Sequence, residues 1–444
     1  MKIDKGLDIP IAGVPEQVIE TGRSLKTVAL LGTDYIGLKP RMLVEPGQVV
    51  SLGEPLVLDK SNSAVQFTSP GTGRVVAVNR GRRRVLQSVV IELDESAASE
   101  KTFDPVQSQN QAAIRDLLLQ SGAWTGFRTR PYNRVPDSSS RACSIFITAI
   151  DTRPLAANPG VVVADRENEF TRGTQIVAQL TDGPVFLCTG PDWSGPEPSG
   201  NGIQRIEFDG PHPAGLPGTH IHYLNPVGAQ RTVWHIDYQD VIAIGHLFKT
   251  GRLLTERVVS IGGPGAVKPR LIRTRLGASI SELMVDEVVS GANCQLISGS
   301  VIDGFVAEGP MAFLGRYDNQ ISVVVKRAER RWFGWFGTEP EKFSFAGLTE
   351  SARGQKHLRE FTTAQNGRRV AMIPAGVFER VMPLDILPVP LLRSLLVKDT
   401  DSAQALGCLE LAEDDLALSS FVCPAKQDYA AALRINLDQI EKEG

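Results

Sequence analysis

The pattern of apolar residues changes along the chain, and this change most constrains the fold. Up to about residue 100, short apolar runs are separated by Gly and Pro turns, which is typical of β structure. Over residues 101–257, alternating strand-like and helix-like segments predict an α/β domain. Short strands with one helix follow over 258–330, and 331–444 is mostly helical in pattern. Because 444 residues are too many for one ordinary core, we predict four domains with these boundaries.

The central α/β segment has the strand and helix order of a Rossmann-like domain but lacks a dinucleotide fingerprint. Such a site needs G-x-G-x-x-G directly after a strand, so that backbone N–H groups reach the pyrophosphate. The turn after the predicted strand 143–150 is instead Asp151-Thr152-Arg153-Pro154. Its side chains would block the approach of a nucleotide, so the sequence predicts the fold without this ligand.

Charge and cysteine content narrow the class of protein. The 47 basic and 50 acidic residues are well mixed, so no global positive field would gather nucleic acid. The five cysteines are odd in number and have no C-x-x-C spacing, which favours reduced thiols in a cytosolic compartment. The N-terminal residues lack the pattern of a secretory signal. No uninterrupted apolar run approaches about 18 residues, so we expect no membrane span.

Near the C-terminus, residues 405–424 have the frame of an iron–sulfur segment without most of its ligands. A bacterial ferredoxin-type segment reads C-x-x-C-x-x-C-x-x-x-C-P because cysteine thiolates hold the irons. Here only Cys423-Pro424 remains, and the three earlier positions carry Glu413, Leu416 and Ser419. Leu cannot ligate a metal, and Ser and Glu are poor cluster ligands. We predict a helical domain that resembles an emptied ferredoxin-like segment; an ordinary leucine core is the alternative.

The first domain resembles the barrel-sandwich (biotinyl/lipoyl-like) domains over 44–78. Gly47 and Gly53 lie at expected tight turns, and a hairpin is expected near 59–63. Lys60 lies in that hairpin, where a carrier domain presents its modified lysine. The tetrapeptide Leu-Asp-Lys-Ser only partly matches a carrier tip, so a plain surface lysine is the alternative.

Two further segments are candidates for partner docking. Arg82, Arg83 and Arg84 form a dense basic turn, which is usually a solvated face but could contact an acidic subunit or lipid phosphate. Trp332 and Trp335 belong to an aromatic cluster flanked by arginines. This composition suits a bilayer interface or a protein hot spot, with an ordinary buried core as the equal alternative.

The stretch 121–136, SGAWTGFRTRPYNRVP, carries a second resemblance. It lies where the NADH-binding flavoprotein subunit of respiratory complex I and the C subunit of the Rnf complex have a glycine-rich flavin loop, G-x-G-G-A-G-F-P-T. Here Ala123 and Trp124 replace glycines and Arg128 replaces the proline, so the indole would obstruct a flavin phosphate.

The side chains that remain in this loop mix aromatic rings with cationic donors. Such a set could hold a planar quinone headgroup by stacking and by hydrogen bonds to its carbonyls. A packing loop with two exposed arginines is the alternative. With the glycine-punctuated loop 31–39, the candidate quinone-binding residues are Tyr35, Lys39, Trp124, Phe127, Arg128, Arg130 and Tyr132.

Five histidines lie between positions 212 and 246. On a strand, His220 and His222 would direct two imidazoles to one face, a spacing that a zinc site could use. No recognised metal signature accompanies them, so we expect surface and packing histidines and no metal site. No nucleophile elbow or Walker loop is visible either, and we expect no catalytic residues in this chain.

The third domain has one clear local signal. Ser279 followed by Glu282 predicts a capped helix start. The segment resembles the small β-grasp domain (soluble-ligand-binding type) that follows the α/β domain in the same flavoprotein family.

Nearly the whole chain resembles the family of A subunits of the sodium-translocating NADH:quinone reductase. The most specific matches are DKSNSAVQFTSPGTG, RGRRRVLQSVVI, FRTRP, SGSVIDG, LDILPVPLLR and FVCPAK. The resemblance implies a peripheral, cofactor-free subunit of a six-subunit pump on the cytoplasmic face of the bacterial inner membrane. Its partners would include integral membrane subunits, and flavins and an iron–sulfur cluster would belong to partner subunits.

The implied role is support of ubisemiquinone reduction to ubiquinol coupled to Na⁺ export, with ubiquinone as a possible ligand. Two alternatives stay open. The chain could be a purely structural scaffold that binds no quinone, or a carrier modified at Lys60.

Overall fold

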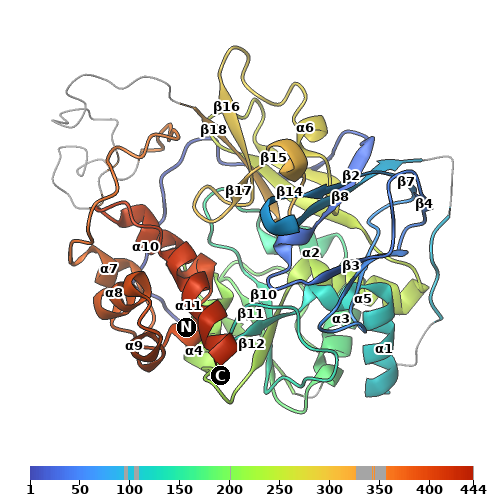
Figure 1. The fold of residues 1–444 in the computed structure, drawn as a ribbon, viewed down its shortest axis with the longest axis horizontal. Helices are drawn as coiled ribbons and strands as arrows, with labels where there is room; N and C mark the ends of the chain where they lie inside the picture. The colour runs from blue at the N-terminus through green and yellow to red at the C-terminus, as the bar shows by residue number, and fades with distance from the viewer. Residues whose placement is uncertain are drawn as a thin grey trace.

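The fold is described over residues 1–94, 99–104, 110–200, 202–326, 343, 345 and 357–443 of the computed structural model. This part of the chain contains four sheets, of six, five, four and three strands. Figure 1 shows the C-terminal helices, in red, and the N-terminal strands, in blue, on opposite sides of the central sheets. None of the helices in the described ranges is long and apolar enough to cross a bilayer.

The N-terminal β structure consists of two antiparallel sheets around one core. The four-stranded sheet has the order β2 (Thr27–Leu31), β8 (Leu86–Leu93), β7 (Gly73–Arg80) and β4 (Val49–Val50), and the three-stranded sheet has the order β3 (Pro40–Met42), β5 (Pro55–Asp59) and β6 (Gln66–Thr68). On β7, Val75 is fully buried while Arg74 and Val76 on either side are exposed. This alternation is what a strand with one face on a core requires, so the short apolar runs form β structure as predicted.

The central sheet is mostly parallel. Its order is β12 (Ile203–Glu207), β11 (Val185–Thr189), β10 (Ile145–Ala149), β13 (Val233–Asp237) and β9 (Arg128–Arg130), and only β9 runs antiparallel to its neighbour. Near-continuous burial of strands such as β11 follows because both faces are covered by helices.

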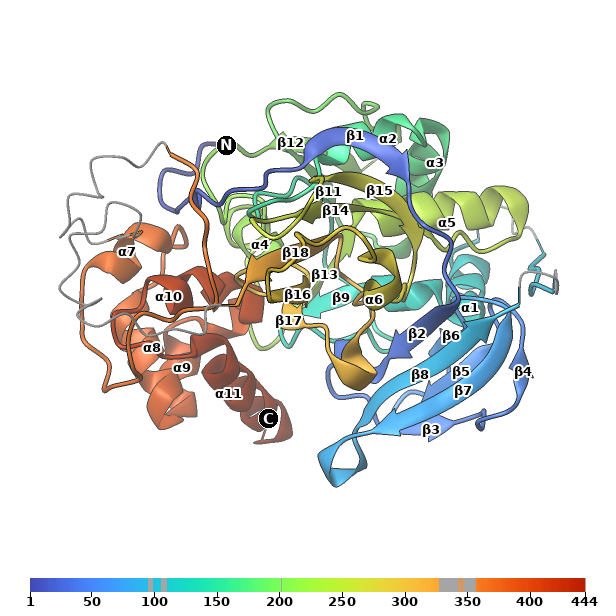
Figure 2. The same cartoon turned by 90° about the horizontal axis from the view of Figure 1, so that it is seen from above.

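Five helices accompany the central sheet. They are α1 (Gln111–Ser121), α2 (Pro159–Ala164), α3 (Glu167–Val177), α4 (Pro217–Leu224) and α5 (Tyr238–Thr250). Figure 2 shows α3 and α5 together at one side of the sheet and α4 at the other. Helices α3 and α5 approach closely at Gly173 and Gly245, where an added Cβ would lie 1.9 Å and 1.8 Å from a carbonyl oxygen of the other helix.

Helix α4 corrects one prediction. His220 and His222 lie on this helix and not on a strand, so their side chains do not share one face. Pro217 stands at the first turn of α4, a position at which proline favours a helix start. The proline is a local signal for a helix, whereas the spacing of the two histidines had suggested a strand.

The third sheet has six strands. Its order is β1 (Glu16–Thr21), β15 (Arg270–Arg275), β14 (Glu256–Gly262), β18 (Gln320–Val325), β16 (Cys294–Ser298) and β17 (Phe305–Val306), and helix α6 (Ile280–Leu283) follows β15. The hydroxyl of Ser279 accepts from the Glu282 N–H, as the predicted cap requires. The Glu282 carboxylate does not return to this helix start; it accepts from Lys26 N–H and the Thr27 hydroxyl beside β2, at 2.6 and 2.5 Å.

Strand β1 lies outside the β structure in which the sequence had placed residues 1–100. It pairs in parallel with β15, more than 240 residues later in the chain. A single, largely exposed edge strand carries no local pattern that specifies its partner, so the sequence could not have assigned it.

The C-terminal segment forms small helices around a separate apolar core. They are α7 (Val377–Val381), α8 (Pro388–Val397), α9 (Thr400–Ala405), α10 (Ala417–Val422) and α11 (Tyr429–Glu443). The core includes Leu391, Leu411, Leu416 and Leu433, all fully buried. In the run 405–424, helical spacing predicted that the leucines face a core; Leu409, Leu411, Leu416 and Leu418 are buried and Leu406 is half-buried. The short helix η8 (Glu413–Leu416) carries part of the emptied frame.

Candidate functional site

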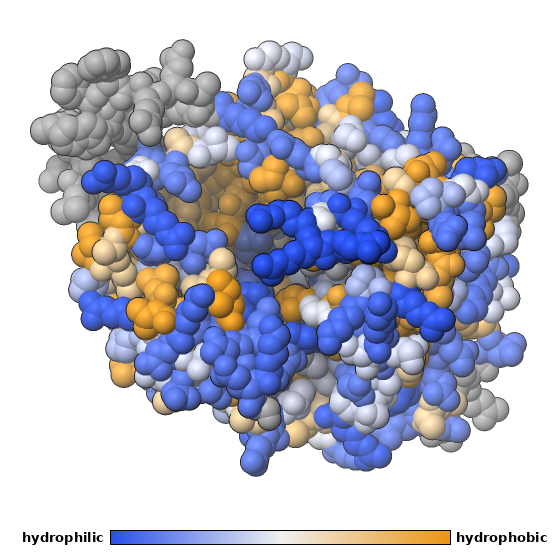
Figure 3. All heavy atoms as spheres, in the orientation of Figure 1, coloured by the Kyte–Doolittle hydropathy of each residue, from blue (hydrophilic) through white to orange (hydrophobic). Residues whose placement is uncertain are grey.

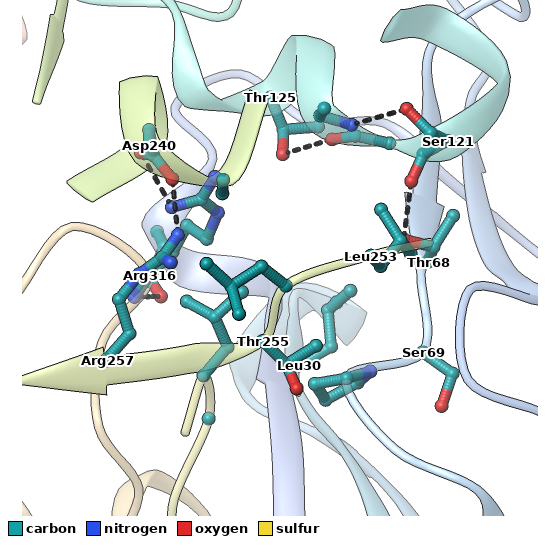
Figure 4. A pocket seen from close by; sticks show the side chains of 18 of the residues that line it. Leu30, Thr68, Ser69, Ser121, Thr125, Asp240, Leu253, Thr255, Arg257 and Arg316 are labelled. Atoms are coloured by element: carbon teal, nitrogen blue, oxygen red, sulfur yellow. Dashed lines mark hydrogen bonds and ion pairs between the residues drawn. The ribbon is translucent and has the colours of Figure 1, made fainter. Parts of the chain in front are cut away.

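A pocket lies where the N-terminal β structure, the central α/β unit and the six-stranded sheet meet (Figure 4). It is bounded by β2, by the turn that follows β6, by the end of α1, and by α5 and residues 253–257 before and within β14. Its volume, counted as the space open to the centres of water-sized spheres, is about 90 Å³. A buried water needs about 10–15 Å³ on this measure, so the pocket has room for a ring-sized group.

One end of the pocket carries a fixed group of charges. Arg257 Nη2 donates to Asp240 Oδ1 at 2.5 Å, and Arg316 Nη1 donates to Asp240 Oδ2 at 3.0 Å. Burial alone would raise the pKa of Asp240, but the two guanidinium groups outweigh it and hold this pKa below its usual range. The Asp240 carboxylate therefore stays ionised and keeps both arginines in place.

Asp34 completes the polar end. Its Oδ2 accepts from the backbone N–H of Arg316 at 2.6 Å. Burial raises the pKa of Asp34 to about 7. Near neutral pH this carboxyl is therefore partly protonated, which leaves the group of two arginines and two acids with a net charge between zero and plus one.

The remaining walls combine apolar side chains with hydroxyls. Leu30, Leu31, Ile244, Leu253, Leu254, Leu276 and Leu314 supply the apolar surface. Figure 4 shows Thr68 and Ser121 at the opposite end from Asp240, with Thr125 between them and Asp240. Gly122 ends α1 in the left-handed region at φ 77°, and an added Cβ there would lie 2.6 Å from Thr68 Oγ1. An apolar pocket with a few fixed polar groups is typical of a small-molecule site.

The predicted quinone-binding residues do not form one cluster. Tyr35 lines the pocket, and its ring lies 6.2 Å from that of Tyr317. Arg128 stacks over Tyr317 at 4.3 Å, and the Tyr317 hydroxyl donates to Thr125 O at 2.9 Å. Lys39 is exposed on the loop before β3. Thus Tyr35 and Arg128 are brought together by Tyr317, a residue that the sequence did not single out.

Trp124 and Phe127 lie inside the protein. Both are fully buried, and Trp124 packs edge-on against Trp234 with ring centroids 5.2 Å apart. The indole N–H donates to Pro136 O at 2.9 Å. Neither ring has a free face for a ligand, so the prediction that they stack on a quinone is wrong and the packing alternative holds for them.

Arg130 and Tyr132 connect the central sheet to the C-terminal helices. Arg130 is fully buried; Nη1 lies 2.7 Å from Asn133 Oδ1 and 3.0 Å from His235 Nε2, and Nη2 lies 3.4 Å from both Asp414 and Asp415. Tyr132 packs against the C-terminal core. The expectation that Arg130 is an exposed arginine, or contacts a ligand, is therefore wrong.

The carboxyl ends of β10 and β13, where open α/β sheets usually bind ligands, are covered by protein. Arg153, after β10, donates to Asp303 at 2.7 Å and lies 3.3 Å from Asp414. Asn319 donates to Asp237, at the end of β13, at 2.9 Å. Side chains of the six-stranded sheet unit and of η8 thus occupy this crevice.

The four positions of the emptied iron–sulfur frame also have protein partners. Glu413 forms a two-point ion pair with Arg434, at 2.5 and 2.9 Å. Leu416 and Ser419 are buried in the C-terminal core region, and Cys423 Sγ lies 3.3 Å from the Tyr429 hydroxyl. Packing and hydrogen bonds therefore take the place that thiolates would have around a cluster.

Two histidines of the 212–246 cluster illustrate how these imidazoles make local hydrogen bonds within the protein. His220 Nε2 lies 3.0 Å from Ala214 O, and burial lowers the pKa of this imidazole to about 3. His222 Nδ1 lies 2.7 Å from Glu410, while its Nε2 accepts from Asp385 N–H at 2.9 Å. No set of three metal-ligating side chains converges within the described ranges.

The candidate docking residues lie apart from the pocket. Arg82, Arg83 and Arg84 form an exposed turn, η2 (Arg82–Arg84), between β7 and β8. Lys60 is exposed at the turn after β5. Trp332 and Trp335 fall outside the described residues.

The charged residues of the pocket were missed because they come from distant segments. Asp240, Arg257 and Arg316 are far apart in sequence, and none belongs to a motif. The sequence did contain a signal: Arg257, after Glu256, precedes the apolar part of β14, and Asp240 lies on a mostly buried helix. A charged side chain in such a place is almost always paired.

Three family descriptions match the chain. Residues 1–94 match the NqrA N-terminal barrel-sandwich hybrid domain, residues 109–253 match the NqrA second alpha/beta domain, and residues 258–308 match the NQRA C-terminal domain. These matches agree with the β sandwich and the α/β unit described above.

Similar proteins extend over the full chain. The A subunit of the Na(+)-translocating NADH-quinone reductase from Rhodopirellula baltica is 50% identical over 100% of this chain and 98% of its own. The proteins of that name from Neisseria gonorrhoeae and Haemophilus influenzae are each 49% identical over 100% of this chain and 100% and 99% of theirs. Among solved structures, an NAD+-reducing [NiFe]-hydrogenase in the air-oxidized state shares 11% identity, with a TM-score of 0.40 over 75% of this chain and 63% of that one.

Proposed function

The chain belongs to the family of A subunits of the Na(+)-translocating NADH-quinone reductase, and we propose that it serves such a reductase as a peripheral subunit without a redox cofactor of its own. Its role is to support reduction of ubisemiquinone to ubiquinol, coupled to Na⁺ export, on the cytoplasmic face of the bacterial inner membrane. Its partners are the remaining subunits of a six-subunit complex, including integral membrane subunits. The flavins and the iron–sulfur cluster belong to partner subunits.

The filled positions support a cofactor-free chain. Trp124 occupies the flavin loop as a packing residue, Arg153 closes the carboxyl end of β10, and Glu413 pairs with Arg434 in the emptied cluster frame. A tightly bound flavin or cluster would have to displace buried contacts at each place. Flavin absorbance and iron analysis of the purified chain test this part, and stoichiometric flavin or iron would overturn it.

The pocket beside Tyr35 is the observation that carries the quinone role. A quinone carbonyl is a hydrogen-bond acceptor on a flat apolar ring, and the pocket offers guanidinium donors at one end of apolar walls. Asp240 fixes both arginines, so their donors are already oriented before a ligand arrives.

Asp34 supplies a proton at the same end of the pocket. Formation of ubiquinol from the semiquinone anion takes up one electron, from a partner subunit, and two protons. Since the pKa of Asp34 is raised to about 7, its carboxyl can hold and release a proton near neutral pH. Arg316, whose backbone N–H bonds the same carboxyl, connects the donor group to the proton carrier.

A titration of the full chain with a short-chain ubiquinone, followed by calorimetry, tests the pocket. We expect saturable binding that weakens at least tenfold in Ala243→Phe, because this α5 residue lines the pocket and a larger ring would fill it. Arg205→Gln on strand β12 is the control, since it removes a surface arginine far from the pocket and should leave binding unchanged. Equal affinity of the Ala243→Phe variant, or no binding by the wild-type chain, would refute the assignment.

A purely structural scaffold is the second candidate. Three residues favour a scaffold role because they make contacts between units: Arg130, Tyr132 and Arg153. A scaffold would show no quinone affinity in the titration above. A carrier role for Lys60 requires a covalent group on this exposed side chain, and an intact mass equal to that of the unmodified chain would eliminate it.

A further inference from the structure

The turn between β7 and β8 projects three arginines into solvent. Arg82, Arg83, Arg84 and the following Val85 are all exposed, and Val85 retains 54% of its accessible surface. Arg83 and Arg84 have φ angles of 53° and 62°, in the left-handed region that favours glycine. The Arg80 guanidinium donates to Arg84 O at 3.2 Å and braces this backbone. The turn is therefore held in an unfavourable conformation that displays charge.

The hairpin that carries the turn is strongly basic. Residues 73–93 contain five arginines, Arg74, Arg80, Arg82, Arg83 and Arg84, and a single acidic residue, Glu92. In the described part of the chain, no carboxylate forms an ion pair with Arg82, Arg83 or Arg84. Since Glu92 lies opposite Arg74 in the ladder, at the other end of the hairpin, the positive charge at the tip is uncompensated.

The position of the turn suits contact with a flat surface. In Figure 2 the β7–β8 connection, in light blue, forms the lowest point of the molecule, while the N-terminus lies at the opposite edge. Figure 3 looks onto this side and shows strongly hydrophilic side chains standing forward at its centre. A plane brought against this face would meet the arginine turn before any other part of the described chain.

We propose that the Arg82–Arg84 turn docks onto the phosphates of anionic lipid headgroups. Guanidinium groups match phosphate oxygens in two-point hydrogen bonds, and basic side chains close to an anionic membrane are attracted to it. A short projecting tip can reach a planar array of phosphates without any complementary surface around it. A protein partner would need such a surface. The inference rests on the proposed peripheral role for its biological setting, but the binding it describes is a property of this chain alone.

Vesicle co-sedimentation of the full chain tests the proposal. We expect binding to vesicles of phosphatidylcholine mixed with phosphatidylglycerol, loss of binding as salt is raised, and no binding to phosphatidylcholine alone. Each basic residue at such a surface contributes about fivefold, so Arg83→Gln with Arg84→Gln should lower the partition coefficient about 30-fold.

The matched control is Lys2→Gln with Lys5→Gln, which removes the same charge from two exposed lysines near the N-terminus, at the far edge in Figure 2. It should retain at least half of the wild-type binding. If the control variant loses as much vesicle binding as the turn variant, the binding depends on overall charge and not on the turn, and the proposal is wrong. Failure of the wild-type chain to bind anionic vesicles at low salt would also overturn it.

Two measurements distinguish lipid docking from docking to a protein subunit and from the proposed quinone role. If the turn variant binds vesicles normally but no longer co-purifies with the other subunits, the turn contacts protein and the lipid proposal is wrong. The quinone titration should be unchanged in the turn variant, because no pocket residue lies in the turn. If the wild-type chain binds anionic vesicles but no quinone, that result counts against the proposed function and leaves the lipid proposal standing.

Discussion

Arg130→Ala should loosen the attachment of the C-terminal helices to the central sheet. The guanidinium is fully buried and reaches Asn133, His235, Asp414 and Asp415 at 2.7 to 3.4 Å. Removing one partner of a buried ion pair usually costs about 3–5 kcal/mol, because the remaining charge is left in a poorly solvating environment.

The structure places the expected loss near the lower end of this range. Asp414 keeps Arg153 at 3.3 Å, and Asp415 still accepts the Ala412 N–H at 2.8 Å. Burial raises the pKa of Asp415 to about 7 even beside Arg130, and removal of that cation would raise this pKa further, so the carboxyl can take up a proton near neutral pH in the variant. We therefore expect a cost of about 3 kcal/mol at a pH near 8.

Hydrogen exchange of the backbone amides is the suitable assay, because it reports the opening of one part of a multidomain chain. A loss of about 3 kcal/mol corresponds to roughly 140-fold faster exchange in α11. Amides of β10 and β11 should change much less. Arg134→Ala is the control. Its side chain is 28% exposed and pairs with Glu441 and, at 3.4 Å, with Asp438, and both carboxylates can return to water when it is removed, so exchange in α11 should rise less than about fivefold.

The refuting results are specific. If Arg130→Ala and Arg134→Ala accelerate exchange in α11 equally, the buried ion network does not hold the two units together. Replacing the whole network provides a second check. Arg130→Met combined with Asp414→Asn and Asp415→Asn should recover most of the protection, because no unpaired charge is left buried.

Two further predictions concern the stability of the central unit. Burial raises the pKa of Asp237 to about 7, so the folded chain binds this proton more tightly than the unfolded chain, and the stability it contributes is lost as the pH rises from about 4 to about 7. Asp237→Asn should therefore flatten the pH dependence of urea unfolding over this window, and an unchanged slope would contradict the assignment. Gly173→Ala places a Cβ 1.9 Å from Val241 O and should cost about 1–3 kcal/mol in thermal unfolding, whereas Gly228→Ala, with no atom within 4 Å, should be nearly neutral.

Local chemistry explains the features that could be predicted from sequence. The Ser279 cap needs only a hydroxyl three residues before a backbone N–H, and the structure has this bond. The inward leucines of the C-terminal helices follow from helical periodicity in the same way. The β structure before residue 100 could be predicted because short apolar runs between Gly and Pro turns are a local signal, and β7 is one of these runs.

The features that could not be predicted depend on partners far away in the chain. Arg130 looked like an exposed ligand-binding residue because the carboxylates that bury it lie about 285 positions later. Trp124 looked like a stacking platform because nothing near it in sequence shows that Trp234 covers its ring. An aromatic and cationic loop has the same composition whether it meets a ligand or another domain.

These misplaced residues share a cause. The loop 121–136 and the frame at Glu413–Cys423 both lie at junctions between units. In this chain Arg130, Arg153 and Arg434 meet Asp303, Glu413, Asp414 and Asp415 there. Charged side chains at those junctions fix how the units are oriented without supplying a ligand site. The pocket beside Asp240 differs, because its arginines are held by one carboxylate and still border open space. A ligand in that pocket would contact all three units at once, so its binding energy would act on their arrangement as well as on the ligand.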